Sequence, residues 1–205
     1  MLRPIHQQKG RAMTCAFDIF SSPVGDLTMI VSDMGLAALL WENDDPRRVR
    51  IDRGERAPGH PLLCETSRQL GAYFSGHLIS FDLPLDFQGT AFQKQVWAAL
   101  LRIPFGEVRS YGAIAADIGR PTASRAVGAA NGRNPISIIA PCHRVIGSAG
   151  ALTGFAGGLQ AKRYLLDHEQ AVLKNGGKWR TRHESDGHSD HWEILVTRPV
   201  SWPLK

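Results

Sequence analysis

The stretch Asn134-Pro-Ile-Ser-Ile-Ile-Ala-Pro-Cys-His-Arg-Val-Ile-Gly147 is the most informative part of this 205-residue chain. Its apolar run at 136–140 is short, rich in isoleucine and bounded by prolines, which favours a buried strand. Pro141 lacks the N–H that a central strand needs, so the strand is expected to stop there. Cys142 would then follow a buried strand, with a fixed backbone and a side chain that can face a cleft.

Helices on either side of this stretch are predicted from apolar spacing and helix breakers. Thr90 can cap a helix whose apolar stripe runs from Phe92 to Leu101, and Pro104-Phe-Gly106 breaks it. Residues 147–158 are rich in small side chains and predict a loop, in which Gly157-Gly158 lets a backbone or a flat ligand approach closely. Helical spacing returns over residues 159–168.

A pair of short helices is predicted between residues 110 and 131. Ser110 can cap the first, over residues 111–118, and Gly119-Arg-Pro121 closes it. The second opens at Thr122 or Ala123 and runs toward Asn131. Two short helices joined by a tight turn with glycine are typical of a helix-turn-helix, although other helical hairpins share the pattern.

The first 87 residues follow a different pattern. Short apolar runs at 15–20, 26–31 and 36–41 alternate with turn signals and predict an antiparallel meander. Residues 44–60 carry five arginines among acids, which favours an exposed loop over a specific anion site. A helix is predicted over 61–75, and residues 78–87 read as a strand plus a crossing connection.

Together these elements predict an α+β fold with two domains. Residues 1–87 form a small antiparallel-sheet domain, and residues 88–171 form a mainly helical domain that carries the helix-turn-helix and Cys142. Residues 172–205 are predicted to be a flexible tail, in which the nearby His183, His188 and His191 favour a polar tail over a metal site. Residues 192–196 are apolar enough for a short docking strand.

Composition restricts the partners and the compartment. A net charge of +5 favours a polyanionic partner, although a solvated positive face is a common alternative. Three cysteines without close spacing argue against a disulfide framework and a CxxC zinc site. The chain has no apolar run of about 18 residues and no secretory signal pattern, so we expect a cytoplasmic protein without a membrane partner.

Cys142 and His143 are the candidate reactive pair. A thiol with an ordinary pKa of about 8.5 is mostly protonated at neutral pH and needs a base before it can attack. Adjacent residues of a strand point apart, so His143 can assist only across a turn or through a water. A carboxylate such as Glu169 can orient the imidazole. Adjacency alone is a weak signal, because a buried inert cysteine beside a histidine is the commoner case.

The chain resembles the O6-alkylguanine-DNA alkyltransferases. Pro141-Cys-His-Arg-Val145 is similar to their active-site signature, and the order and spacing agree from about Thr90 to Glu169. Further matching motifs are Phe105-Gly-Glu-Val108, Ser124-Arg-Ala-Val-Gly128, Asn134-Pro135, Gly157-Gly158 and Leu165-Leu-Asp-His-Glu169. The likeness is weaker over residues 15–87, where the family has a ribonuclease H-like domain, and it does not cover the tail.

The resemblance implies a suicide repair protein that moves an alkyl group from O6-alkylguanine, and possibly from O4-alkylthymine, in double-stranded DNA onto Cys142. His143 takes the thiol proton through a water, Glu169 holds His143, and Tyr111 helps protonate the leaving guanine. The resemblance further implies a guanine pocket formed by Asn134, Val145, Phe155, Ala156, Gly157 and Lys162. It places Ser124, Arg125, Ala126 and Arg144 at the DNA, with Arg125 entering the base stack.

No cofactor is implied, and a monomer is expected because each molecule reacts once. Phe155 stands where relatives often carry tyrosine, and Ala156 where some carry a small hydroxyl residue. The ligands of the zinc site of some members have no evident counterparts, so we expect no metal.

Other classes of protein remain open on the residues alone. A non-catalytic reader of alkylated DNA would replace the cysteine, commonly by tryptophan. A transcriptional regulator would need a further domain, for which the N-terminal half is too short. A cysteine hydrolase would turn over through an acyl intermediate, and a plain DNA-binding module would lose nothing when Cys142 becomes serine.

Overall fold

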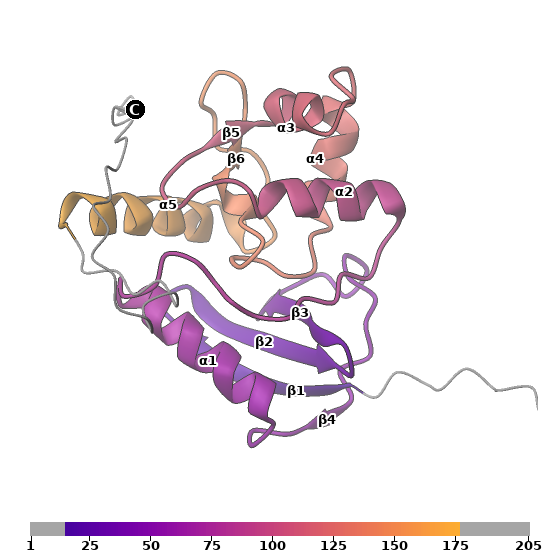
Figure 1. Ribbon diagram of the computed structural model, residues 1–205, viewed down its shortest axis with the longest axis vertical. Coiled ribbons are helices and arrows are strands. Elements are labelled where there is room, and N and C mark those ends of the chain that lie inside the picture. The colour runs from indigo at the N-terminus through magenta and orange to yellow at the C-terminus, as the bar shows by residue number, and fades with distance from the viewer. Residues whose placement is uncertain (1–14, 177–205) are drawn as a thin grey trace, which may run out of the picture.

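The computed structural model describes residues 15–176. Its elements form a sheet with one helix in the N-terminal half and a group of helices in the C-terminal half (Figure 1). Within these residues, no helix combines the length and the apolar character that crossing a membrane requires. The histidines and the apolar segment predicted beyond residue 176 lie outside the described part of the chain.

The sheet is mixed, not purely antiparallel. Strands β1 (Ala16–Ser22), β2 (Gly25–Ser32) and β3 (Gly35–Trp41) form the predicted meander. A fourth strand, β4 (Glu55–Arg56), pairs in parallel with β1 and gives the order β3-β2-β1-β4. Two residues are too few to leave an apolar pattern in the sequence, and this is why β4 was not predicted.

Helix α1 (Pro61–Phe74) covers one face of the sheet and closes the N-terminal core. Proline fits the first position of this helix, because an N–H there would have no partner within the helix. The His60 side chain accepts a hydrogen bond from the Leu62 amide. Leu63 and Leu70 are fully buried against Leu27 and Leu39 of the sheet. Burial of each leucine stabilises the domain by about 1.5–3 kcal/mol.

Residues 75–90 form an extended connection, so the strand predicted within 78–87 is wrong apart from one bridge at Leu85. This connection hydrogen-bonds to Leu36 at the start of β3 through the Pro84 carbonyl and the Asp86 amide. Gly35 permits the close approach, since a Cβ there would lie 2.5 Å from the Pro84 oxygen. Pro84 cannot donate to a ladder, so a regular strand does not form.

The C-terminal half contains the predicted helix-turn-helix. Helix α2 (Ala91–Leu100) starts with a capping box between Thr90 and Gln93, and α3 (Tyr111–Asp117) starts at the Ser110 cap. Helix α4 (Ser124–Gly132) follows after a turn. The three helices bury a second core, which consists of Val96, Trp97, Ala99, Leu100, Ile103, Ile114, Ala115, Val127, Ala130, Cys142 and Val145.

The strand predicted over residues 136–140 is not formed, although every one of these residues is buried. The segment is a series of turns with one bridge between Leu39 and Ile136, and Ile138 has a φ of 69°. Asn134 explains the shape, because its side chain bonds to the backbone at Ile136 and Ala140 and replaces ladder partners. Apolar content predicted the burial correctly but not the backbone conformation.

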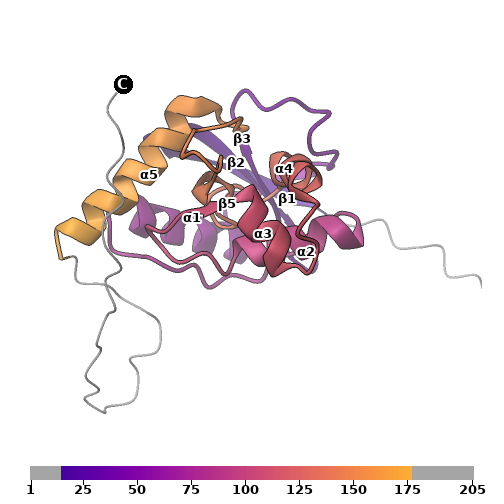
Figure 2. The ribbon, with the colours of Figure 1, turned by 90° about the horizontal axis from the view of Figure 1, so that it is seen from above.

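This segment lies between the two halves of the molecule (Figure 1). Ile136, Ile138 and Ile139 join the core formed by the sheet and α1, whereas Cys142 belongs to the helical core. A short 3₁₀ helix (Cys142–Arg144) leads to β6 (Val145–Ile146), which pairs with β5 (Arg109–Ser110). Helix α5 (Gly158–Lys174) continues past the predicted domain end at residue 171. Figure 2 shows α5 on the opposite side of the molecule from α2 and α3.

Candidate active site

Cys142 is a buried thiol at the first position of the 3₁₀ helix. Only 3% of the residue is exposed, and its amide donates to the Ala140 carbonyl at 2.7 Å. Burial raises the pKa of the Cys142 thiol, while Asn134, Arg48, Lys162 and Ser137 act in the opposite direction. The thiol is therefore protonated at rest in neutral solution and has to lose its proton before it can attack.

Asn134 joins the end of α4 to the segment that carries Cys142. The residue is fully buried, its Nδ2 donates to the Ala140 carbonyl at 2.7 Å, and its Oδ1 accepts from the Ile136 amide at 3.1 Å. Both bonds are made inside the turn before Cys142. The side chain thus fixes the shape of the turn before Cys142, and the Asn134 amide, which donates to the Asn131 carbonyl at 3.1 Å, ties this turn to α4.

His143 is completely buried, and its two ring nitrogens differ in their surroundings. Nε2 lies 2.7 Å from Glu169 Oε1, whereas Nδ1 has no hydrogen-bond partner within residues 15–176. Burial lowers the pKa of His143, although the Glu169 carboxylate opposes this effect. Because Nε2 donates to the carboxylate, the neutral imidazole keeps its lone pair on Nδ1, ready to accept a proton.

Glu169 in α5 is fully buried and receives hydrogen bonds from four residues. Oε1 accepts from His143, from the Tyr73 hydroxyl at 2.9 Å and from Arg144, and Oε2 accepts from the Gly106 amide at 2.8 Å. Burial alone would raise the pKa of Glu169. The charges and hydrogen bonds of His143 and Arg144 outweigh it and lower the pKa to about 2. Glu169 is therefore ionised throughout the physiological range.

Arg144, which the resemblance places at the DNA, is buried instead. The residue is 6% exposed, its Nε and Nη2 donate to Glu169, and its Nη1 donates to the Ile103 carbonyl at 2.6 Å. A phosphate contact would break these buried bonds and leave the carboxylate without its counter-charge. Arg144 is instead part of the support of Glu169.

The loop between β6 and α5 carries most of the predicted pocket residues. The Tyr111 hydroxyl lies 2.8 Å from the Thr153 hydroxyl of this loop. The half-buried Phe155 packs edge-on against Trp41 at 5.2 Å between ring centroids. Ala156 and Gly157 are half-buried as well. These contacts bring Tyr111, from the helix-turn-helix, next to the loop that follows Cys142.

Lys162 in α5 holds this loop from inside. The residue is fully buried, and its Nζ donates to the Val145 carbonyl at 2.6 Å and to the Thr153 carbonyl at 3.2 Å. Burial lowers the pKa of Lys162, and the neighbouring Cys142 opposes this effect. Both carbonyls belong to the chain that leaves Cys142, so Lys162 fixes the strand and the loop of the pocket to each other.

Helix α4 carries three of the residues that were predicted to contact DNA. Arg125 and Ala126 are exposed in its first turn and Ser124 is half-buried, while Val127 and Ala130 face the helical core. Within residues 15–176, the Arg125 side chain makes no hydrogen bond or salt bridge. A free cation at the exposed start of a helix can interact with a nucleic acid without first breaking a bond to the protein.

Two models of protein families match the sequence, and together they cover both halves of the chain. Residues 91–171 match the DNA-binding domain of 6-O-methylguanine DNA methyltransferase, and residues 16–87 match its ribonuclease-like domain. A methylated-DNA–protein-cysteine methyltransferase from Methanosarcina barkeri is 49% identical over 158 residues, which span 77% of this chain and 99% of that protein. The chain belongs to the 6-O-methylguanine DNA methyltransferase family.

Solved structures of this methyltransferase family share the fold. An O6-methylguanine methyltransferase from Mycobacterium tuberculosis superposes with a TM-score of 0.70, at 45% identity over 80% of this chain and 100% of that one. The M. tuberculosis protein solved in complex with DNA gives a TM-score of 0.71, at 47% identity over 77% of this chain and 94% of that one. The mixed sheet of the ribonuclease-like domain and the helical DNA-binding domain are thus features of the methyltransferase family.

Two supporting residues of this methyltransferase were not predicted from the sequence. Tyr73 lies 96 positions before Glu169 in the chain, so no local pattern connects them. Arg48, in the loop predicted to be simply exposed, forms an ion pair with Asp44, and its Nη1 donates to the Asn134 carbonyl at 2.6 Å. The Tyr73–Glu169 and Arg48–Asn134 contacts cross between the N-terminal and C-terminal halves, and only the fold brings these partners together.

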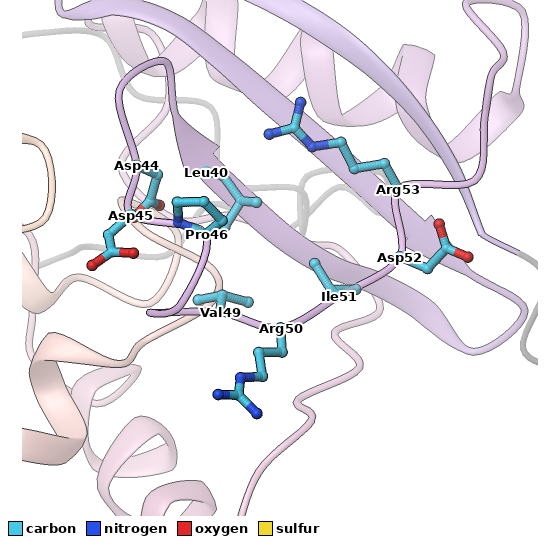
Figure 3. A pocket seen from close by; sticks show the side chains of 9 residues that line it. All are labelled: Leu40, Asp44, Asp45, Pro46, Val49, Arg50, Ile51, Asp52 and Arg53. Atoms are coloured by element: carbon cyan, nitrogen blue, oxygen red, sulfur yellow. The ribbon is translucent and has the colours of Figure 1, made fainter.

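The loop that carries Arg48 also borders a hollow of about 390 Å³ on the N-terminal domain (Figure 3). Val49 and Ile51 pack against Leu40 of β3, while Arg50 and Asp52 are exposed. None of the residues around Cys142 lines this hollow. Across the described residues, no group of three histidine, cysteine or acidic side chains is arranged to hold a metal ion.

Proposed function

We propose that this chain is a methylated-DNA–protein-cysteine methyltransferase in which Cys142 is the acceptor. The observation that carries the proposal is the buried Cys142 thiol followed directly by His143, whose Nε2 is bonded to an ionised Glu169 and whose Nδ1 is free to accept a proton. A base with a fixed tautomer beside a buried thiol is what nucleophilic activation of cysteine requires.

The transfer is a displacement at the alkyl carbon. Cys142 loses its proton to Nδ1 of His143 through a water molecule, and the thiolate attacks the carbon bound to O6. The sulfur–carbon bond forms as the carbon–oxygen bond breaks, and guanine leaves with a proton supplied with the help of Tyr111. The proton lost by the thiol balances the one gained by guanine. A thioether is a stable product, so each molecule reacts once and needs no cofactor.

The lesion has to leave the duplex before it can reach the thiol. Extrusion of a base costs a few kcal/mol, and phosphate contacts together with an inserted side chain can offset that cost. Arg125, exposed and unbonded within the described residues at the start of α4, is the proposed side chain that fills the stack, with Ser124 and Ala126 beside it. The proposed guanine pocket consists of Asn134, Val145, Phe155, Ala156 and Gly157. Lys162 supports it through its hydrogen bonds to the Val145 and Thr153 carbonyls.

The proposal extends to the substrate, the assembly state and the domain boundary. The substrate is double-stranded DNA with O6-alkylguanine, the protein acts as a monomer in the cytoplasm, and its two domains divide at residues 87–88.

The test is the mass of the intact protein after incubation with a duplex that contains one O6-methylguanine. We expect a gain of one methyl group, mapped to Cys142 and absent in Cys142→Ser. Cys64→Ser is the matched control, because Cys64 is an exposed free cysteine that should not react and whose loss should change nothing. Lesion-selective binding without a mass gain would favour a non-catalytic reader, and neither effect would leave only the fold.

A further inference from the structure

Tyr73, in α1 of the N-terminal domain, reaches the carboxylate that holds His143. Its hydroxyl donates to Glu169 Oε1 at 2.9 Å, and the His143 Nε2 lies 2.7 Å from the same oxygen. All three side chains are almost completely buried. A group from the ribonuclease-like domain and the proposed base of the transfer therefore share one acceptor atom.

The ring of Tyr73 is held from several sides. It packs edge-on against Phe74 and Phe105, with centroid distances of 5.2 and 6.0 Å, and lies 5.4 Å from Phe81. His168 of α5 contacts the same ring at 5.3 Å, and its Nε2 lies 2.8 Å from the Tyr73 carbonyl. These contacts fix the ring, so the hydroxyl has little freedom to leave Glu169.

The hydroxyl acts on Glu169 only as a donor. Burial and the negative charge of Glu169 raise the pKa of Tyr73 well above its ordinary value, so the phenol remains neutral. A carboxylate oxygen offers about two lone pairs, and Oε1 already serves Tyr73, His143 and Arg144. The hydrogen bond from Tyr73 thus limits the rotation of the carboxylate. It also weakens the hydrogen bond that the carboxylate accepts from Nε2 of His143.

We propose that Tyr73 is a positioning residue for alkyl transfer, which fixes Glu169 Oε1 and through it the orientation and basicity of His143. This inference rests on the proposed function, since it assigns a role within that reaction. It makes the N-terminal domain a contributor to the active site and not only a scaffold for it. Only 1% of Tyr73 is exposed, so it is out of reach of DNA bound at the surface, and its effect has to appear in the reaction step and not in binding.

Tyr73→Phe removes the hydroxyl and keeps the ring that the neighbouring aromatics hold. The carboxylate then has one donor fewer and holds the imidazolium of His143 more strongly, which raises the pKa of His143. The other charges that act on His143 are those of Arg144 and Lys162, and the Tyr73→Phe substitution leaves both side chains in place. His143 is a competent base only when neutral, so the rising limb of the rate against pH should move to higher pH.

The experiment compares the full-length wild-type protein, Tyr73→Phe and Thr66→Val. Thr66 is a matched control, because it is a fully buried residue of the same helix whose hydroxyl donates only to the Leu62 carbonyl. The rate constant of methyl transfer is measured from a duplex with one O6-methylguanine in single-turnover mode, at saturating DNA and from pH about 6 to about 9. The DNA concentration for half-maximal rate is recorded as well.

For Tyr73→Phe we expect the maximal rate constant to fall about three- to tenfold, as the loss of one hydrogen bond would produce. Its pH profile should shift upward and its half-saturating DNA concentration should stay unchanged. Thr66→Val should follow the wild type in both respects. A Tyr73→Phe profile that coincides with the wild type, or a fall in rate that is equal in Thr66→Val, would overturn the inference. Failure of the wild type to methylate Cys142 would instead refute the proposed function.

Discussion

At the scale of single residues, Glu169 shows how a buried charge is kept. Its side chain has no exposure, yet His143, Tyr73, the Gly106 amide and the Arg144 guanidinium all donate hydrogen bonds to the carboxylate. Burial of an unpaired carboxylate would force it to take up a proton, whereas paired and hydrogen-bonded carboxylates stay ionised. The ionised form fixes the tautomer of His143, so the same bonds serve stability and the proposed chemistry.

The low pKa of Glu169 predicts how stability depends on acidity. Its folded pKa of about 2 lies below the ordinary 4.5, so its contribution is complete above pH 4.5 and is lost as pH falls toward 2. The separation corresponds to at most about 3 kcal/mol of unfolding free energy. His143, whose pKa is also lowered, adds a loss that begins below 6.5, because the unfolded chain takes up the proton first.

Urea unfolding at several pH values measures this dependence. Glu169→Gln should lose the slope between pH 4.5 and 2, and at pH 7 it should be less stable by about 3 kcal/mol because Arg144 remains buried without a counter-charge. Glu107→Gln is the control: Glu107 pairs with Arg109 at the surface, and its loss should cost under about 1 kcal/mol. Identical slopes for the wild type and Glu169→Gln would refute the assignment.

At the scale of secondary-structure elements, the start of α5 packs closely against the sheet. Gly157 precedes the helix, and a Cβ there would lie 2.6 Å from the indole of Trp41 in β3. The indole cannot move freely, because its Nε1 donates to Ser137 Oγ at 3.1 Å and Phe155 packs against it. The φ of Gly157 is −79°, which any residue can adopt, so the requirement for glycine is steric.

Gly157→Ala should therefore displace the loop that follows Cys142. We expect a loss of about 1–3 kcal/mol in unfolding free energy, as overpacking produces, and a slower methyl transfer because Phe155 and Ala156 move with the loop. Chemical denaturation and single-turnover transfer measure the two effects. Gly154→Ala lies in the same loop with nothing within 4 Å of the added Cβ, so it should resemble the wild type.

The elements also show what could be predicted from the sequence. The meander, α1 and the capped helices α2 and α3 were all predicted, because apolar period and capping residues are local signals. The turn conformation of residues 136–140 could not be predicted, since it depends on Asn134 bonds that compete with a strand. The partnership of Glu169 with Tyr73 and Arg144 and the contact of Arg48 with Asn134 depend on tertiary structure alone.

At the scale of the whole molecule, Cys142 is packed between two cores. The thiol belongs to the helical core, and the turn before it belongs to the core of the sheet and α1. Only 3% of Cys142 is exposed, so a methyl group added to the sulfur has to be accommodated among closely packed neighbours. Alkylation should therefore strain the contacts between the halves.

The methylated protein is expected to be less stable than the unmodified one. Overpacking by one methyl group costs about 1–3 kcal/mol, which lowers the Tm by several degrees for a chain of this size. The measurement is a thermal melt of protein that has reacted with O6-methylguanine DNA and been freed from it. Cys142→Ser taken through the same steps controls for the treatment, and an equal or higher Tm after methylation would refute the prediction.

The depth of Cys142 has a consequence for selectivity among the cysteines of the chain. Cys64 is open to solvent, whereas Cys142 is enclosed and its thiol is held in the protonated, unreactive form. Peroxide and small soluble electrophiles attack accessible thiolates, so they should react with Cys64 much faster than with Cys142. A protein that can act only once thereby keeps its acceptor away from chance encounters. Access to the sulfur then requires a ligand that the protein surface binds and that is thin enough to reach Cys142.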